Sequence, residues 1–437
     1  MTLRIFVCCF FFILLSTGCN NKTADTTARK VYIEHINGKY TLYRCNKPFV
    51  IKGAAGYTNL DVLAAAGGNT IRIWDTTNVD MILQQANKHH IAVIMGLPMP
   101  ESRFIAYYND PAKVARQFSA FQKLVNKYKK NPAVLMWCVG NELSFPFRPS
   151  YGNFYKAFNR IVKMIHHDDP DHPVTTTIVN FNKYDIFNIK IRTDVDIVSF
   201  NIFGRLSYMR DDLKSFRWLW RGPFMITEWG VDGPWLDNPQ TAWGAYIEAT
   251  STNKAQQIID RYRHDVPVED PRFLGAFIFY WGQKQETTQT WFSLFDENGG
   301  KTEVVGAAQY LWTGKWPLNT PPQVKGMLIG GKSALNNLIY KPGYKLAAEV
   351  VMQKPNADIT KVQWQIFAED WYKKDNLNST AKKTEIGGLV QSVQNLQATF
   401  VTPAKPGPYR VFATLFDRYG NIATCNIPFY VLADNNK

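Results

Sequence analysis

Eight short apolar runs alternate with stretches of helical periodicity, and this alternation constrains the fold of the 437-residue chain more than any other feature. Buried parallel strands carry continuous apolar sequence, and helices between them complete repeated βα units. Eight such units in about 270 residues match the usual size of a closed (β/α)8 barrel. The predicted strands are residues 48–53, 70–74, 91–97, 134–140, 174–178, 197–203, 224–228 and 273–281.

The stretches between these runs show the spacing of amphipathic helices. Apolar side chains recur three or four positions apart at Val114, Phe118, Phe121 and Val125, and residues 154–165 repeat the pattern. A hairpin is predicted over residues 31–43, with its turn at Asn37 and Gly38, and we expect it to close the bottom of the barrel. Further helices are predicted at residues 78–90, 209–220, 253–266 and 304–312.

The pattern changes after a proline-marked boundary at residues 315–322. Beyond it, Val362, Trp364, Ile366 and Ala368 alternate with mostly polar neighbours, which is the period of half-buried strands. A less regular alternation covers residues 409–415 and 423–431, joined by a turn at 417–421. The sequence therefore predicts an α/β barrel with its hairpin over residues 31–316, followed by a small all-β, immunoglobulin-like sandwich over residues 317–437.

The amino terminus has the pattern of an export signal. Arg4 precedes an apolar run at residues 5–15, which is shorter than the roughly 20 residues that cross a bilayer. Small residues then precede Cys19, an arrangement that resembles a bacterial lipoprotein signal. We expect a signal peptide at residues 1–19, lipidation at Cys19 and a polar tether at residues 20–30. Cleavage by the ordinary signal peptidase is the alternative, and the two routes predict a lipid-anchored protein of the outer membrane or periplasm, or a secreted one.

Composition argues against several other functions. The net charge of +14 is spread over both predicted domains, so nucleic-acid binding is not expected. Three of the six cysteines precede residue 20, and the others, Cys45, Cys138 and Cys425, are scattered without a CxxC pair. This spacing favours neither a disulfide framework nor a zinc site, and we predict no metal and no other cofactor.

Two glutamates directly follow apolar strands of the predicted barrel. Reactive groups of such barrels lie at the carboxyl ends of the strands. The fourth strand is followed by Asn141 and Glu142, and the seventh ends at Glu228, before Trp229 and Gly230. Charges that follow buried strands seldom lack a partner or a purpose, so we interpret the glutamates as a catalytic pair, with surface salt bridges as the alternative.

A pair of carboxyl groups suits the cleavage of an acetal. The leaving oxygen needs a proton while positive charge builds on the anomeric carbon, so one carboxyl must start protonated and the other ionised. Carboxylates about 5–5.5 Å apart allow direct attack and retention of configuration, whereas a wider gap admits water and gives inversion. The chain has no Gly-x-Ser-x-Gly elbow, so a serine hydrolase is poorly supported.

These motifs resemble glycoside hydrolase clan A, the retaining β-glycosidases with one glutamate on strand four and another on strand seven. The resemblance covers about residues 48–312 and is closest to the barrels of families two and five. Residues 67–74 and 131–134 add to it.

The resemblance implies that Glu142 is the acid/base, that Glu228 is the nucleophile and that Asn141 binds the 2-hydroxyl of the sugar. Arg72, near the end of strand two, is expected beside the nucleophile, where its charge would keep Glu228 ionised; an ordinary ion pair is the alternative. Asp75 follows the same strand and is expected either to contact substrate or to cap the next turn.

Aromatic residues are expected to contact sugar rings, whose C–H faces pack against indole. Trp281 ends strand eight, where clan members usually place a sugar-stacking aromatic. Trp74, Trp229, Trp235 and Trp291 lie at strand ends or in loops, and each is either a subsite residue or part of the core. The loop after strand eight is expected to recognise sugar hydroxyls through Gln283, Lys284, Gln285 and Glu286.

One position departs from the clan pattern. Clan members often have a tyrosine near the end of strand six that donates a hydrogen bond to the nucleophile, but this chain has Phe203 there. Either Tyr208 reaches in from the following loop, or the contact is absent.

The sequence thus predicts a retaining β-glycosidase that cleaves a β-linked oligo- or polysaccharide and is held at a membrane by a lipid anchor. A transglycosylase with the same carboxylates and a non-catalytic glycan-binding surface lipoprotein are the alternatives. The sandwich either binds carbohydrate through Trp364 and Trp371 or serves as a spacer or packing unit, with Trp364 in its core.

Overall fold

A closed barrel of eight parallel strands forms the first part of the computed structural model, which describes residues 31–356, 358–373 and 381–433. The strands neighbour one another in the order β10-β11-β4-β5-β6-β7-β8-β9. They are β4 (Ile51–Ala55), β5 (Thr70–Arg72), β6 (Ala92–Leu97), β7 (Val134–Val139), β8 (Val174–Val179), β9 (Ile197–Asn201), β10 (Phe224–Trp229) and β11 (Phe273–Phe279). The predicted (β/α)8 barrel is confirmed, whereas the predicted signal peptide, Cys19 and the tether lie outside the described residues.

The barrel strands are almost completely buried because both of their faces are covered. Every residue of β6, β7 and β10 is buried, between side chains that fill the barrel and helices that surround it. Three predicted strand ends are two residues too late, since β5 ends at Arg72, β9 ends at Asn201 and β11 ends at Phe279. The end of β11 matters most, because the chain turns after Phe279 and strand alternation does not extend to Trp281.

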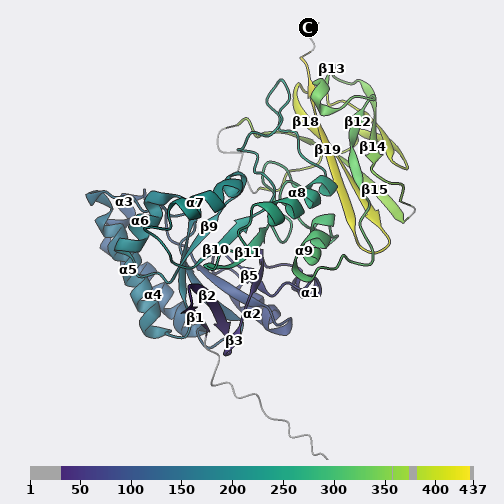
Figure 1. Cartoon of the computed structure of the whole chain (residues 1–437). Coiled ribbons are helices and arrows are strands. Elements are labelled where there is room, and N and C mark those ends of the chain that lie inside the picture. The colour runs from purple at the N-terminus through teal and green to yellow at the C-terminus, as the bar shows by residue number, and fades with distance from the viewer. Residues whose placement is uncertain (1–30, 357, 374–380, 434–437) are drawn as a thin grey trace, which may run out of the picture.

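Helices cover the outside of the barrel (Figure 1). They are α1 (Leu60–Ala65), α2 (Val79–Lys88), α3 (Ile105–Tyr108), α4 (Pro111–Tyr128), α5 (Gly152–Asp168), α6 (Lys183–Arg192), α7 (Met209–Ser215), α8 (Ser251–His264) and α9 (Glu303–Thr313). The Asp110 side chain caps α4 by accepting the N–H groups of residues 112 and 113. The helix predicted over residues 209–220 ends early, because Phe216 and Trp220 are buried from turns and only mimic helical spacing.

A hairpin lies across the amino-terminal end of the barrel (Figure 1). It is formed by β1 (Val31–Ile36) and β2 (Lys39–Arg44), and β3 (Lys47–Pro48) adds a short third strand. Positive φ angles at Asn37 and Gly38 form the tight turn that the sequence predicted. The backbone N–H groups of residues 31 and 40 donate to the carbonyls of Asp171 and Pro271, just before β8 and β11. These bonds hold the hairpin over the bottom of the barrel.

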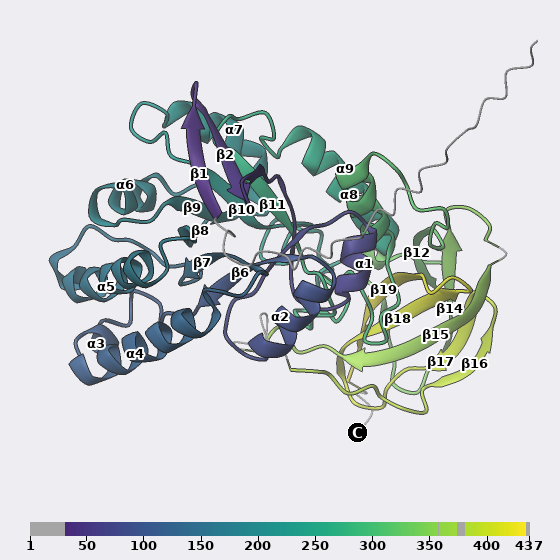
Figure 2. The same ribbon diagram turned by 90° about the horizontal axis from the view of Figure 1, so that it is seen from below.

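Two four-stranded sheets form a sandwich beside α8 and α9 (Figures 1 and 2). One sheet contains β12 (Val324–Ile329), β14 (Lys345–Met352), β17 (Gln397–Val401) and β16 (Val390–Gln394). The other contains β13 (Ile339–Tyr340), β19 (Ile422–Val431), β18 (Gly407–Asp417) and β15 (Ile359–Ala368). The predicted sandwich is confirmed. Its core runs from Val324 to Val431, and the barrel core ends at Trp312.

The outer face of the second sheet packs towards the barrel. Trp364 and Ile366 are buried in the sandwich core, but Ala368 is exposed, so the alternation predicted for β15 fails at its end. Arg410, on β18, is 1% exposed although it lies on the outer face, where its Nη2 donates to the carbonyl of Tyr246 in the barrel domain. Both faces of this sheet therefore carry buried residues. Among the described residues, no helix combines the length and apolar character needed to cross a membrane.

Candidate active site

The mouth of the barrel encloses a cavity of about 1120 Å³, named here the catalytic cavity. Glu142 and Glu228 both line it, as predicted from their positions just after β7 and near the end of β10. A single ligand in this cavity could therefore contact both carboxyl groups. Its wall also includes Tyr57, Trp74, Asp75, Asn141, Asn180, Asn201, Phe203, Arg205, Trp235, Phe279, Tyr280, Lys284, Gln285 and Glu286.

Two donors hold the carboxylate of Glu228. Nη1 of Arg72 donates to Oε1 over 2.5 Å, and the indole Nε1 of Trp74 donates to the same oxygen over 2.6 Å. The Arg72 side chain is 1% exposed and that of Glu228 is 8% exposed, so this is a buried, charge-assisted pair. Among the described residues, both donors to this carboxylate contact Oε1, so Oε2 is left for a ligand. Arg72 thus lies beside Glu228, as predicted.

Asn201 connects the two glutamates. Its Nδ2 donates to Oε1 of Glu142 over 2.8 Å, and its Oδ1 accepts Nη1 of Arg72 over 3.3 Å and Oγ1 of Thr227 over 3.0 Å. Because Arg72 also binds Glu228, one short chain of polar contacts joins both carboxyl groups. Sequence reasoning missed Asn201, whose position at the end of β9 was the only signal.

Asn141 belongs to the same network. Its Oδ1 accepts Nη2 of Arg72 and, over 3.3 Å, Nδ2 of Asn201. The side-chain oxygen is therefore held by the protein, and the amide nitrogen is the group that remains to contact a sugar.

The two carboxyl groups have different surroundings. Glu142 has a left-handed backbone (φ 55°) and keeps contact with solvent, because the cavity is open, but the cavity walls still crowd its carboxyl group. This loss of hydration raises the pKa of Glu142, the negative charge of Glu228 raises it further, and the Asn201 hydrogen bond opposes the change. Glu142 is accordingly the carboxyl group better suited to hold a proton.

Three of the predicted tryptophans do not line the catalytic cavity. Trp281 is fully buried and packs edge-on against Phe295 and tilted against Trp312 of α9. Trp229 is 1% exposed and packs against Tyr262 of α8. Neighbouring residues on a strand point to opposite sides. Because Glu228 faces the cavity, Trp229, which follows it on β10, points outward to the helices. Trp291 is also buried, and its Nε1 donates to the carbonyl of Asp232.

The aromatic residues that line the cavity include Trp74, Tyr280 and Trp235. The rings of Trp74 and Tyr280 are stacked, with centroids 5.8 Å apart and planes 20° from parallel, and Trp235 is 46% exposed. Burial raises the pKa of Tyr280 to about 12. Tyr280 therefore lines the cavity where Trp281 was predicted, and both residues follow β11, which ends at Phe279.

Phe203 lines the cavity, while Tyr208 is 58% exposed and lies outside the cavity wall. The suggestion that Tyr208 reaches the nucleophile is therefore wrong, and Arg72 and Trp74 supply the donors. Asp75 caps the following turn, since its Oδ1 accepts the N–H of Thr77 over 2.7 Å, and it also lines the cavity; its contact with substrate stays a prediction.

The strand-eight loop (residues 280–295) forms one side of the cavity. Lys284 and Glu286 form an ion pair at 3.2 Å, and burial raises the pKa of Glu286. Gln285 is 7% exposed, and its Nε2 has no hydrogen-bond partner among the described residues. The predicted polar residues of this loop thus gather at the cavity, and one of them carries an unused donor.

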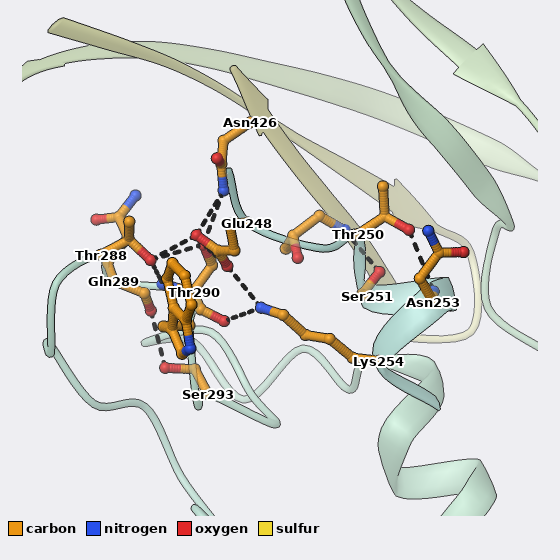
Figure 3. A network of polar contacts seen from close by, with 12 residues as sticks. Glu248, Thr250, Ser251, Asn253, Lys254, Thr288, Gln289, Thr290, Ser293 and Asn426 are labelled. Atoms are coloured by element: carbon orange, nitrogen blue, oxygen red, sulfur yellow. Dashed lines mark hydrogen bonds and ion pairs between the residues drawn. The ribbon is translucent and has the colours of Figure 1, made fainter. Parts of the chain in front are cut away.

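A buried ion pair fastens this loop (Figure 3). Oε1 of Glu248 lies 2.5 Å from Nζ of Lys254 on α8, and both side chains are almost completely buried. Thr288 and Thr290 of the loop donate to the same carboxylate over 2.6 and 2.8 Å, and Nδ2 of Asn426 on β19 donates to it over 2.7 Å. Burial alone would raise the pKa of Glu248, but the charge of Lys254 and these donors hold it below its usual range. Residues of the barrel domain, the strand-eight loop and the sandwich therefore all contact the carboxylate of Glu248.

Across residues 31–356, 358–373 and 381–433, no three His, Cys, Asp or Glu side chains gather as a metal site. Cys45 is exposed, Cys138 and Cys425 are buried, and none of these three is in a disulfide.

Residues 73–283 match the family model described as glycosyl hydrolases family 2, TIM barrel domain. The beta-glucuronidases of Rattus norvegicus and Mus musculus are 26% identical over 188 residues and 25% identical over 227 residues. These matches cover 40% and 48% of this chain but 27% and 33% of the relatives, so the chain spans a third or less of these proteins.

Solved structures show the same fold at low sequence identity. The Bifidobacterium dentium beta-glucuronidase complexed with coumarin-3-O-glucuronide is 16% identical, with a TM-score of 0.51 over 65% of this chain and 49% of that one. The Bacteroides uniformis beta-glucuronidase is 13% identical, with a TM-score of 0.51 over 92% of this chain and 48% of that one. The predicted resemblance to clan A is confirmed, because residues 73–283 are similar to the TIM-barrel domain of the family 2 glycosyl hydrolases.

Proposed function

We propose that this protein is a retaining β-glycosidase that cleaves a β-linked glycan by double displacement. The observation that carries the proposal is the pair of carboxyl groups in one cavity, joined through Asn201 and Arg72. Glu142 has a raised pKa, which suits a proton donor, and Glu228 is paired with a buried guanidinium, which suits an ionised nucleophile.

In the first step, Glu142 donates its proton to the leaving oxygen as the bond between that oxygen and the anomeric carbon breaks. Glu228 forms a bond to the same carbon, and the leaving sugar departs as an alcohol. In the second step, the Glu142 carboxylate takes a proton from water, and the water oxygen displaces Glu228. Two inversions give net retention, and Glu142 recovers its proton.

The surrounding residues suit this sequence of events. Arg72 and Trp74 hold Oε1 of Glu228, so Oε2 is the oxygen that bonds to carbon. The amide nitrogen of Asn141 is placed to bind the sugar's 2-hydroxyl, because its oxygen is already held by Arg72. Hydrogen bonds to that hydroxyl strengthen in the transition state and so contribute to rate.

Substrate recognition is assigned to the cavity walls. The stacked rings of Trp74 and Tyr280, together with Trp235, offer apolar surfaces for the C–H faces of sugars. The unpartnered Nε2 of Gln285 is a donor for a sugar hydroxyl, and Asp75 offers a carboxylate oxygen.

The test is a panel of p-nitrophenyl β-glycosides that includes glucoside, galactoside, mannoside, xyloside and glucuronide. The glucuronide belongs in it because the similar proteins are named beta-glucuronidases. For the substrate that is cleaved, proton NMR should show the β-anomer as the first product. An α-anomer at the outset would refute double displacement, and turnover by Glu228→Gln within tenfold of wild type would refute the assignment of the nucleophile.

The same assay separates the alternatives. Products longer than the substrate, formed in the presence of free sugar acceptors, would favour a transglycosylase. Binding of glycans without turnover of any of them would favour a non-catalytic glycan-binding lipoprotein. The intact carboxyl pair and its network favour the enzyme over the binding protein.

We also propose that the protein is exported and anchored to a membrane through a lipid on Cys19. The apolar run at residues 5–15 and the small residues before Cys19 support this proposal. In a bacterial host, the wild-type protein should incorporate labelled palmitate and sediment with membranes, whereas Cys19→Ser should do neither. Equal labelling of both proteins would refute the anchor.

A further inference from the structure

We propose that a second cleft, between the strand-eight loop and the sandwich, binds sugar units of the glycan chain beyond the unit whose bond is cleaved. We name it the interdomain cleft. The inference rests on the proposed function and deepens it: the substrate is a β-linked chain of several sugars, and the sandwich takes part in binding it.

The interdomain cleft has a volume of about 500 Å³, which lies within the usual range of ligand sites. The strand-eight loop forms one wall, and strands β15, β18 and β19 of the sandwich form the other. Gln283, Gln289 and Lys382 line both this cleft and the catalytic cavity. The two spaces therefore adjoin each other, and the cleft lies on the side of the catalytic cavity from which a glycan chain would extend towards the sandwich.

The sandwich wall is chemically suited to sugar hydroxyls. Gln363 on β15 is paired with Thr414 on β18, which in turn is paired with Thr424 on β19, so amide and hydroxyl groups form a row across three strands. These residues alternate with Trp364 and Cys425, which point into the sandwich core. Amides and hydroxyls both donate and accept hydrogen bonds, as a sugar requires of its site.

The two walls are held in a fixed relation to each other. The Glu248 carboxylate binds Thr288 and Thr290 of the strand-eight loop on one side and Asn426 of β19 on the other (Figure 3). Lys383 adds a bond from the sandwich side to the loop, because its Nζ donates to the carbonyl of Thr287 over 3.5 Å. A site that is already assembled loses less conformational entropy on binding, so these contacts favour affinity for an extended chain.

Chain length is the variable that tests this inference. The substrates are β-linked oligosaccharides of glucose, mannose, xylose and galactose, from dimer to hexamer, together with the p-nitrophenyl glycoside that is cleaved best. We expect kcat/KM of the wild-type protein to rise at least tenfold from the dimer to the longer chains of the preferred series. A kcat/KM that does not change with length would overturn the inference.

A double variant locates the effect. Gln363→Ala with Thr414→Val removes polar groups from the cleft wall, and Gln397→Ala with Thr399→Val makes the matched change on β17 of the other sheet. The first should lose at least tenfold in kcat/KM on the long chains and change less than twofold on the p-nitrophenyl glycoside. The second should retain the full chain-length effect. Equal losses on long and short substrates in the first variant, or a loss of the chain-length effect in the second, would overturn the inference.

Failure of the proposed function gives a different result. If no substrate is turned over, calorimetry with the four hexamers decides the inference by itself. Binding of a hexamer to the wild-type protein that is lost in the cleft variant, with both proteins folded by circular dichroism, supports a glycan cleft in a protein that is not an enzyme. No binding of any hexamer overturns the cleft, whatever the catalytic result.

Discussion

Replacing Asn201 by alanine tests how the two glutamates are coupled. The side-chain nitrogen donates to Glu142 over 2.8 Å, and this bond stabilises the charged form of the carboxyl group. Its loss should therefore raise the pKa of Glu142 above its already raised wild-type value. A general acid works while protonated, so the alkaline limb of kcat/KM should move to higher pH.

The size of the rate effect follows from the contacts. A hydrogen bond to a charged group contributes about 1.5–3 kcal/mol, and the lower end applies because the cavity is open to water. At about 1.4 kcal/mol per factor of ten, kcat/KM should fall roughly tenfold at the wild-type optimum. The buried Asn201 side chain also accepts from Arg72 and Thr227, so its removal should also lower the free energy of unfolding, by about 1–3 kcal/mol.

The assay is kcat/KM against pH with a disaccharide or alkyl glycoside, whose poor leaving group requires the proton donor. Ser199→Ala is the matched control, because Ser199 lies on the same strand and loses a 2.6 Å contact with Thr175 but does not contact either glutamate. The control should lose stability and keep the wild-type pH profile. An alkaline limb that moves to lower pH in Asn201→Ala, or that stays in place, would refute the reasoning.

Three further changes test other parts of the structure. Trp74→Phe keeps a ring but removes the donor 2.6 Å from Glu228, so kcat should fall about 10- to 100-fold in steady-state assays; an unchanged kcat would contradict the assigned contact. Glu248→Gln leaves its lysine partner charged and buried, which should cost about 3–5 kcal/mol in urea unfolding at neutral pH. The pKa of Glu248 is lowered in the folded state. The stability that its charge contributes is therefore present above the unfolded pKa of about 4.3 and is lost as pH falls through the folded value. The difference in unfolding free energy between wild type and Glu248→Gln should narrow in acid, and a difference that does not change with pH would contradict this. Trp281→Ala should lower the free energy of unfolding by about 3–5 kcal/mol while KM changes less than twofold, because Trp281 is buried in the core. A large rise in KM would show that Trp281 contacts the substrate.

The glutamates were predictable because their positions depend on local signals. An apolar run marks a buried barrel strand, and the residue after it lies at the mouth of the barrel. Glu142 and Glu228 satisfy that rule without any knowledge of how the strands are paired. Arg72 and Trp74 follow the same logic on strand two, and all four residues meet at the catalytic cavity or its wall.

The orientation of the tryptophans was not predictable in this way. Strand alternation fixes the direction of a side chain only as far as the strand runs, and the last pairing of β11 joins Phe279 to Ala55. The apolar sequence continues through Trp281 and so conceals this end. Beyond it the chain turns, and Tyr280 lines the cavity while Trp281 is buried against α9.

The amino-acid sequence by itself determined the kinds of element, their order and the ends of the strands on which reactive groups lie, because periodicity and apolar runs are properties of neighbouring residues. Only the tertiary structure decided the contacts between distant segments. Glu142 meets Asn201 across 59 positions, and Glu248 meets Asn426 across 178. Hydrogen bonds of this kind depend on distances of about 3 Å between atoms that the chain does not bring together until the barrel closes and the sandwich docks.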